Sequence, residues 1–250
     1  MMAPEDTRAG VSVVIPARDE ADSIEMLVDE IAAALDKLTA YQIIVVDEGS
    51  LDSSESLLRR MLESRPWLRA LRHQTSCGKS AAIRTGVIAA EYPIIVTVDG
   101  DGQNDPAYIA PLLTALGGDP RVGLVAGQRT RRGDSGWKKF QSRIGNWVRG
   151  KLLKDATRDS VCGLKAFRRD VFLALPYFDT MHRFLPALVR REGYEIRHVD
   201  VVDRPRRHGL SHYGMWDRLL VGIPDLAGVW WLLRRRRRVP LVSEVRRNAD

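Results

Sequence analysis

The chain has 250 residues, enough for one sizeable α/β domain or two small ones. Apolar residues make up 44% of the composition and charged residues 28%, which excludes a disordered or collagen-like chain. The formal charge of +7 is unevenly distributed: residues 1–128 carry 11 basic and 19 acidic side chains, whereas residues 129–250 carry 28 and 13. This division predicts two tasks, the second of which involves an anionic partner.

The two cysteines, Cys77 and Cys162, predict neither a disulfide framework nor a metal site, so a reducing compartment is expected. The first ten residues include acids and lack the apolar segment of a secretion signal. No run of about 20 apolar residues is present that would span a bilayer. These features predict a cytoplasmic protein.

In the first 130 residues, short β-rich segments alternate with helical patterns. Strands are expected over 11–15, 41–46, 68–73, 94–98 and 122–126, with helices between them over 22–38, up to 64, 79–90 and 106–116. Asp22 and Glu25 have the spacing of a capping box, and Asp105 followed by Pro106 is typical of a helix N-cap and first residue. Such alternation predicts βαβ units and a parallel sheet.

The second half is less regular. Helices are expected over 135–153, 180–192 and 216–233, strands over 161–167 and 195–202, and a basic loop over 204–214. Five arginines, Arg234–Arg238, follow the last helix.

Acidic residues follow three of the predicted strands, as Asp19 and Glu20, then the pair at 47–48, then the pair at 99 and 101. Ligands of open α/β sheets bind beyond the carboxyl ends of the strands, so these acids should meet at one site. Such a site suits a metal, or the hydroxyl and ring N–H groups of a nucleoside, better than a bare phosphate.

Asp99, Asp101 and Gln103 place three oxygen ligands two residues apart, which suits a divalent metal, Mg²⁺ or Mn²⁺, that takes the rest of its shell from phosphates and water. A D-x-D pattern alone also fits a solvated loop; the strand before it and the helix cap after it favour the metal. Gly78-Lys79-Ser80 is not a phosphate-binding P-loop, because position 73 is His where that motif requires Gly.

Four segments, in this order, resemble the inverting glycosyltransferases of family 2: VSVVIPARDE (11–20), VVDEGSLD (45–52), GKSAAIRTG (78–86) and VDGDGQNDP (98–106). Within that family the chain is similar to the polyprenyl-phosphate branch, of the dolichol-phosphate mannose synthase type. The resemblance covers about residues 10–215. It implies a GT-A fold (Rossmann-like α/β, with a mostly parallel sheet flanked by helices), a nucleotide-sugar donor, a divalent metal and a lipid-phosphate acceptor.

The resemblance also implies site residues by position. It assigns the donor nucleotide to Pro16, Arg18, Glu20, Val46, Asp47, Glu48, Asp99, Gly100, Arg129, Arg206 and His212. It assigns the metal to Asp99, Asp101 and Gln103, and the catalytic set to Asp101, Lys138, Ser142 and Asp159. The family usually has Asp at position 48, an aromatic residue at 18, Arg at 138 and Lys at 212, and the first two departures leave the base, guanine or uracil, open.

Purely structural interpretations of the same residues remain open. The 47–50 segment also fits an ordinary turn and helix cap, Lys138 a solvated helix face shared with Ser142, and Asp159 a turn cap. A lipid monophosphate carries about −1.5 charge near pH 7 and needs cations to position it, whereas a hydroxyl acceptor needs a carboxylate base, for which Asp159 is the candidate. The basic second half favours the phosphate.

The last predicted helix carries an apolar stripe made of Trp216, Leu219, Leu220, Ile223, Ala227, Trp230 and Leu233. Trp231 and the arginines at its far end are typical of an interfacial helix on an anionic membrane. The alternative is a helix that packs on the core and ends in a solvated basic tail. Relatives of this branch often continue into transmembrane helices, so a separate membrane-protein partner is a further expectation.

We therefore expect a flexible N-terminus over 1–10, a GT-A domain over 11–215 with a nucleotide and metal half (11–128) and an acceptor half (129–215), an interface helix over 216–238, and a tail over 239–250. The expected function is sugar transfer, with inversion, from a GDP- or UDP-sugar to dolichyl or undecaprenyl phosphate, by a peripheral protein at the cytosolic membrane face. The alternatives are a related transferase acting on a hydroxyl of an envelope glycan or lipid, and a non-enzymatic basic module that binds membranes. Nucleic acid is not an expected partner, because it gives the acidic strand ends no role.

Overall fold

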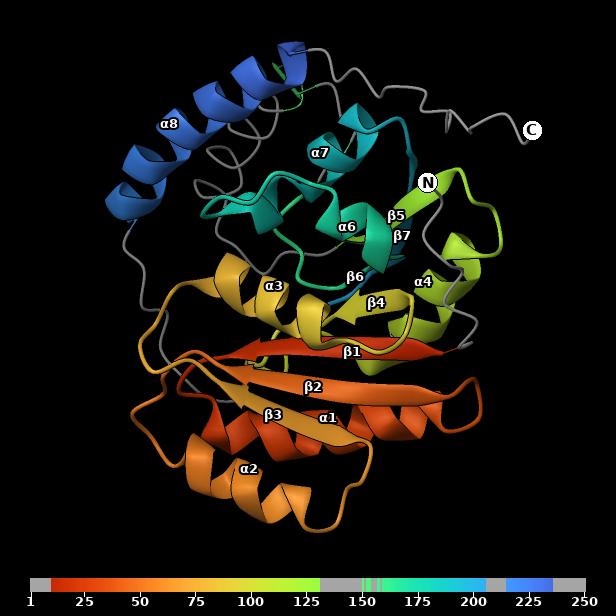
Figure 1. The fold of residues 1–250 in the computed structure, drawn as a ribbon, viewed down its shortest axis with the longest axis vertical. Coiled ribbons are helices and arrows are strands. Elements are labelled where there is room, and N and C mark those ends of the chain that lie inside the picture. Colours follow the sequence, from red (N-terminus) through yellow and green to blue (C-terminus); the bar gives the residue numbers. More distant parts are fainter. Residues whose placement is uncertain are drawn as a thin grey trace, which may run out of the picture.

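The computed structural model of the chain describes residues 10–130, 150, 152–153, 157, 159–205 and 215–235. Seven strands form one sheet in the order β3-β2-β1-β4-β6-β5-β7 (Figure 1). The strands are β1 (Val11–Ala17), β2 (Tyr41–Asp47), β3 (Leu68–Arg72), β4 (Ile94–Thr97), β5 (Val122–Arg129), β6 (Lys165–Arg168) and β7 (Glu195–Val201). Neighbouring strands pair in parallel except where β6 is involved, so the expected α/β fold with a mostly parallel sheet is confirmed.

Helices cover both faces of this sheet (Figure 1). They are α1 (Ala21–Leu35), α2 (Ser54–Leu62), α3 (Lys79–Ala89), the 3₁₀ turn η1 (Pro106–Tyr108), α4 (Ile109–Leu116), α6 (Arg169–Leu173), the 3₁₀ turn η2 (Met181–Arg183), α7 (Leu185–Arg191) and α8 (Met215–Arg234). Side chains of a strand alternate between faces. Val13 and Ile15 of β1 therefore pack with α1, α2 and α4, whereas Val14 packs with α3, α6, α7 and α8. Central strands buried on both faces explain the continuous apolar runs in the sequence.

Strand β6 begins four residues later than the sequence pattern predicts, at Lys165 rather than 161. The reason lies in the carbonyl groups of the preceding segment, which accept side-chain donors instead of pairing along a strand. The carbonyl oxygen of Cys162 accepts from the Lys165 ammonium, and that of Gly163 accepts from Thr97 Oγ1 at 2.7 Å. The strand then runs antiparallel to both β4 and β5.

Two helix starts differ from expectation. The predicted capping box at Asp22 is wrong: α1 begins after Glu20, and no side chain caps it from that position. The backbone N–H of Ala21 instead donates to Asp52 Oδ2 at 3.0 Å, a partner from a different loop. The helix predicted over 180–192 is split into η2 and α7, because Pro186 has no N–H to continue a helix from the turn before it.

The predicted cap at Asp105 is confirmed, since its Oδ1 accepts from the N–H of Ala107 at 3.0 Å with Pro106 as the first helical residue. The helix predicted over 135–153 lies almost entirely outside the described residues, as do the basic loop from 206 to 214, residues 1–9 and residues 236–250.

Candidate functional site

The ends of the parallel strands β1, β2, β4, β5 and β7 lie along one side of the sheet, which we call the carboxyl edge. The structure brings most of the predicted site residues to this edge: Pro16, Arg18, Glu20, Val46, Asp47, Glu48, Asp99, Gly100, Asp101, Gln103 and Arg129. Asp159 also lies at this edge, because it precedes β6, and β6 runs antiparallel to its neighbours and so begins at the edge where they end. Lys138, Ser142, Arg206 and His212 lie outside the described residues.

Carboxylates hold the loops after β1 and β2 together. Asp19 has a left-handed backbone (φ 54°), and its Oδ1 accepts from the N–H of Leu51 at 2.7 Å while its own N–H donates to Ser50 Oγ at 2.9 Å. Asp52 accepts from the N–H groups of Ala21 and Ser54 at 3.0 and 2.9 Å. Each contact joins a carboxylate or hydroxyl to backbone, so the two loops have one fixed relative arrangement.

Asp47 and Glu48, next to each other at the end of β2, have different surroundings. Asp47 is buried, and its two oxygens accept from the N–H of Ser50 and from Arg72, each at 2.9 Å. This geometry matches the turn-forming interpretation of Asp47. Burial raises the pKa of the Glu48 carboxyl, and the charges of Lys79 and Arg18 oppose that rise.

At the end of β4, Asp99 forms an ion pair with Lys79, the first residue of α3, with 2.5 Å between Nζ and Oδ1. Gly163 packs directly against this carboxylate: a Cβ there would lie 1.9 Å from Asp99 Oδ1. Any larger residue at 163 would therefore displace Asp99. Neither the rejected P-loop pattern nor the family resemblance of residues 78–86 assigns Lys79 a role, so its pairing with Asp99 was not predicted from the sequence.

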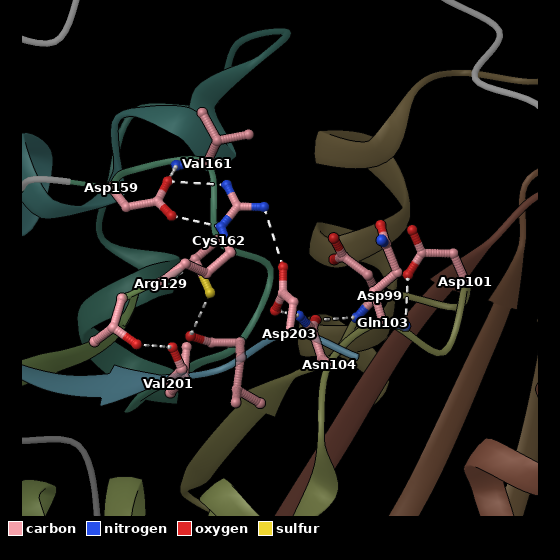
Figure 2. Close-up of polar contacts among 12 residues, drawn as sticks. Asp99, Asp101, Gln103, Asn104, Arg129, Asp159, Val161, Cys162, Val201 and Asp203 are labelled. Atoms are coloured by element: carbon pink, nitrogen blue, oxygen red, sulfur yellow. Dashed lines mark hydrogen bonds and ion pairs between the residues drawn. The ribbon is translucent and has the colours of Figure 1, made fainter. Parts of the chain in front are cut away.

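The loop after β4 carries the predicted metal ligands. The N–H of Gln103 donates to Asp101 Oδ1 at 3.1 Å, and the side chains of Asp99, Asp101 and Gln103 project to the same side of the loop (Figure 2). Within the described part of the chain, no group of three or more His, Cys, Asp or Glu side chains could hold a metal ion. Two carboxylates and an amide oxygen fit a hard divalent cation that takes its remaining ligands from a bound phosphate and water.

Arg129, at the end of β5, is the centre of a polar network (Figure 2). Its Nε and Nη2 donate to the two oxygens of Asp159 at 2.5 and 3.0 Å, and its Nη1 donates to Asp203 Oδ2 at 3.2 Å. Burial opposes its charge, but the hydrogen bonds and charge of Asp159, together with the charge of Asp203, hold the pKa of Arg129 above its ordinary value. The other oxygen of Asp203 accepts from Asn104 Nδ2 at 3.3 Å. Neither Asp203 nor Asn104 was found by sequence reasoning.

A buried cation lies behind this network. Lys165 is 3% exposed, and burial lowers the pKa of its ammonium to about 8. Burial and the charges of Lys79, Lys165 and Arg183 also lower the pKa of His182 well below its usual range. His182 Nδ1 lies 2.8 Å from Ser80 Oγ, which ties η2 to the start of α3. Burial and the neighbouring positive charges therefore favour the uncharged form of His182.

Helix α8 packs on the rest of the protein through Val229, which is 2% exposed, and through half-buried neighbours including Leu226 and Leu233. Of the predicted apolar stripe, Ala227 is exposed, and the side chains at 216–223 are outside the described residues. Trp231 is 54% exposed, with Arg235 Cζ 4.7 Å from the centre of its ring. No helix among the described residues has the length and apolar character needed to cross a membrane.

Comparisons with known proteins come from sequence and from structure. The model of a family described as Glycosyl transferase family 2 matches residues 12–175. The chain is 30% identical over 232 residues to a dodecaprenyl-phosphate galacturonate synthase of Rhizobium johnstonii, covering 91% of this chain and 68% of that protein. It is 32% identical over 208 residues to an undecaprenyl-phosphate 4-deoxy-4-formamido-L-arabinose transferase of Edwardsiella ictaluri, covering 82% and 63%. The chain therefore spans about two thirds of the length of these relatives.

Among solved structures, the chain is similar to glucosyl-3-phosphoglycerate synthase from Mycobacterium tuberculosis. The complex of that protein with Mg²⁺ and UDP superposes with a TM-score of 0.68 at 19% identity, covering 90% of this chain and 79% of the other. Its complex with Mn²⁺ and UDP-glucose gives 0.64 at 22% identity, covering 88% and 79%. At this identity the likeness establishes a shared fold.

Proposed function

Because the chain belongs to glycosyl transferase family 2, we propose that it transfers a sugar from a nucleotide-sugar donor to a polyprenyl phosphate, with inversion at the transferred carbon. The GT-A fold implied by the sequence motifs is confirmed by the sheet topology and the structural neighbours. The observation that carries the proposal is the meeting of Asp99, Asp101 and Arg129, from two strand ends, at one carboxyl edge.

The nucleoside is proposed to lie over the ends of β1 and β2. Asp19 and Asp52 hold the loops after these two strands together. The residues assigned to the nucleoside lie at the strand ends and in these loops: Pro16, Arg18, Glu20, Val46 and Glu48. Gly100, on the loop after β4, lies against β1: a Cβ there would be 3.1 Å from the carbonyl oxygen of Pro16, so this loop approaches the end of β1 closely. The structural neighbours were solved with UDP and UDP-glucose, which supports a nucleoside diphosphate as donor fragment. Whether the base is guanine or uracil rests on the departures at 18 and 48.

A divalent metal is proposed at Asp99, Asp101 and Gln103, whose oxygens suit Mg²⁺ or Mn²⁺. When bound, the ion would supply positive charge beside the diphosphate. The chain's own contribution is the pairing of Lys79 with Asp99 and of Arg129 with Asp159 and Asp203, which fixes two cations before the donor arrives. Fixed charges lower the cost of the negative charge that develops on the leaving diphosphate.

A phosphate acceptor is favoured over a hydroxyl by the environment of Asp159. A hydroxyl acceptor needs a carboxylate that takes its proton, and both oxygens of Asp159 accept hydrogen bonds from Arg129. A lipid phosphate is already anionic and requires cations, which the basic second half supplies. Lys138, Ser142, Arg206 and His212 are proposed for the phosphates and the transferred sugar on their match to the family pattern. The two sequence relatives act on polyprenyl phosphates, as their names state.

Attachment to the cytosolic face of an anionic membrane, with or without a membrane-protein partner, is proposed through α8. Its exposed Trp231 and the arginines at its end combine an aromatic ring with positive charge, the pair that interfacial helices present to headgroups. The same helix also packs on the core, so the alternative interpretation of a core-packing helix is met in part by Val229.

The test of the proposed function uses labelled nucleotide sugars and membranes that contain undecaprenyl or dolichyl phosphate. Asp101→Ala should lower the rate of transfer by about a hundredfold or more, because it removes a metal ligand beside the developing charge. Asp22→Ala, an exposed carboxylate at the start of α1, is the matched control and should leave transfer unchanged. Undiminished transfer by Asp101→Ala would remove the metal role, and absence of a lipid-linked sugar in the wild type would remove the acceptor.

A further inference from the structure

Asp203 follows β7 and lies between two parts of the site that are distant in sequence (Figure 2). One carboxylate oxygen accepts from Asn104 Nδ2 at 3.3 Å, on the loop after β4. The other accepts from Arg129 Nη1 at 3.2 Å, at the end of β5. Its side chain is 17% exposed, and burial raises the pKa of its carboxyl while Arg129 and Asn104 lower it.

The side-chain amide of Asn104 can make both of its hydrogen bonds in only one of its two possible orientations. It is 4% exposed, and its Oδ1 accepts from the backbone N–H of Asp99 at 3.1 Å while its Nδ2 donates to Asp203. If the amide turned over, its NH₂ would face the N–H of Asp99 and its oxygen would face a carboxylate. The negative oxygen of Asp203 therefore fixes the orientation of Asn104, and Asn104 in turn holds the backbone at Asp99.

The residue after Asp203 strengthens the same connection. The N–H of Arg204 donates to the carbonyl oxygen of Gln103 at 2.8 Å, and its guanidinium pairs with Asp105 at 2.9 Å and with Glu30. The end of β7 is thus fastened directly to the C-terminal end of the loop that carries the predicted metal ligands, and through Asn104 to the backbone of Asp99 at its start. These contacts join two strand ends that do not pair with each other, because β6 and β5 lie between β4 and β7 in the sheet.

We propose that Asp203 is a positioning residue, which holds the loop carrying Asp99 and Asp101 and the guanidinium of Arg129 at a fixed separation so that both act on one donor diphosphate. This inference rests on the proposed function for its diphosphate. Loss of Asp203 should reduce turnover more than donor affinity, because the loops after β1 and β2 that are proposed to hold the nucleoside are locked by Asp19 and Asp52, which do not contact Asp203. A small displacement of a group that acts on the transition state costs about tenfold or more in rate.

The sharpest test exchanges the amide and the carboxylate. In Asp203→Asn, the new amide can direct its oxygen to Arg129, and its NH₂ then meets the NH₂ of Asn104. In Asn104→Asp, two carboxylates face each other. In the double variant, Asp at 104 accepts from the N–H of Asp99 and from the new amide, whose oxygen accepts from Arg129, so every donor again has an acceptor at unchanged net charge.

We expect each single variant to lower kcat by about tenfold or more with the donor KM changed by less than about threefold, and the double variant to return to within about threefold of wild type. Asp22→Asn is the matched control and should not change kcat. A double variant as slow as the single ones, or a loss confined to KM, would overturn the role of Asp203. If Asp203→Asn does not fold, Asp203→Glu keeps the charge on a longer arm; it should lower kcat severalfold, and an unchanged kcat would overturn the proposal.

A second measurement needs no substrate and separates this inference from the proposed function. Hydrogen exchange at the Asp99 amide should become about tenfold faster in Asp203→Asn and slow again in the double variant, since that amide donates to Asn104. Unchanged exchange at Asp99 would overturn the coupling even in a protein that transfers no sugar to lipid. Wild-type failure to transfer sugar, with the exchange pattern as expected, would contradict the proposed function alone.

Discussion

At the ends of β1 and β2, carboxylates bind mainly backbone N–H groups, whereas at the ends of β4, β5 and β7 they bind cationic side chains. Asp19 and Asp52 accept from the N–H groups of Leu51, Ala21 and Ser54. Asp99 and Asp159 instead hold Lys79 and Arg129. The first arrangement fixes the shape of two loops. The second keeps positive charges in place at an edge where an anionic diphosphate is proposed to bind, so the same residue type serves rigidity in one region and charge placement in the other.

The largest expected effect comes from removing the cation of the second region. Arg129→Met leaves the buried carboxylate of Asp159 and the half-buried one of Asp203 without their cation, and we expect the free energy of unfolding to fall by about 3 kcal/mol. Asp52→Ala removes an exposed carboxylate that accepts hydrogen bonds from two backbone N–H groups, and a loss of about 1 kcal/mol is expected. Urea denaturation of both variants measures the difference. Equal losses would show that the two regions do not differ in this way.

Lys165 sharpens the comparison, because the hydrogen bond of this buried cation goes to the carbonyl of Cys162 rather than to a carboxylate. Its pKa is about 8 in the folded protein against 10.5 for an ordinary lysine, so the unfolded chain binds the proton more tightly. The contribution of this group to stability is therefore complete above pH 10.5, decreases as pH falls from 10.5 to about 8, and is lost below that.

We expect the free energy of unfolding of the wild type to rise between pH 8 and pH 10.5 relative to Lys165→Met, by roughly 3 kcal/mol. The difference between the two proteins at each pH removes the contribution of other titrating groups. Parallel pH profiles would mean that Lys165 has an ordinary pKa and that its burial is compensated.

The smallest expected effect is on membrane binding, and it concerns arginines that stack on aromatic rings. On α8, Arg234 and Arg235 stack on Trp230 and Trp231, with Cζ 3.6 and 4.7 Å from the ring centres. Trp231→Ala should weaken partition onto vesicles of mixed phosphatidylglycerol and phosphatidylcholine by about tenfold, since it removes the exposed ring. Leu38→Ala, 50% exposed after α1, is the control. Equal partition of the two variants would contradict a membrane contact at Trp231.

Local patterns were enough to predict much of the fold. Apolar runs predicted all five strands of the first half, and Asp105 with Pro106 predicted the start of η1, because these features depend on near neighbours. The start of α1 and the extent of β6 were wrong for the opposite reason. Ala21 finds its partner in Asp52, and the carbonyls of Cys162 and Gly163 bind side chains in place of a strand.

The sequence alone determined that the acidic residues after β1, β2 and β4 meet at the carboxyl edge, since parallel strands joined by helices end on the same side of a sheet. It could not determine the pairings within that edge. Lys79 with Asp99, Arg129 with Asp159, and Asp203 with both Asn104 and Arg129 join residues 20 to 99 positions apart. Those partners depend on the sheet order and on the reversal of β6, which are set by the packing of the whole chain rather than by any local pattern. The same holds for the charge difference between the two halves of the chain. Its size follows from the composition, whereas the tertiary structure decides which charges pair with each other and which face outward.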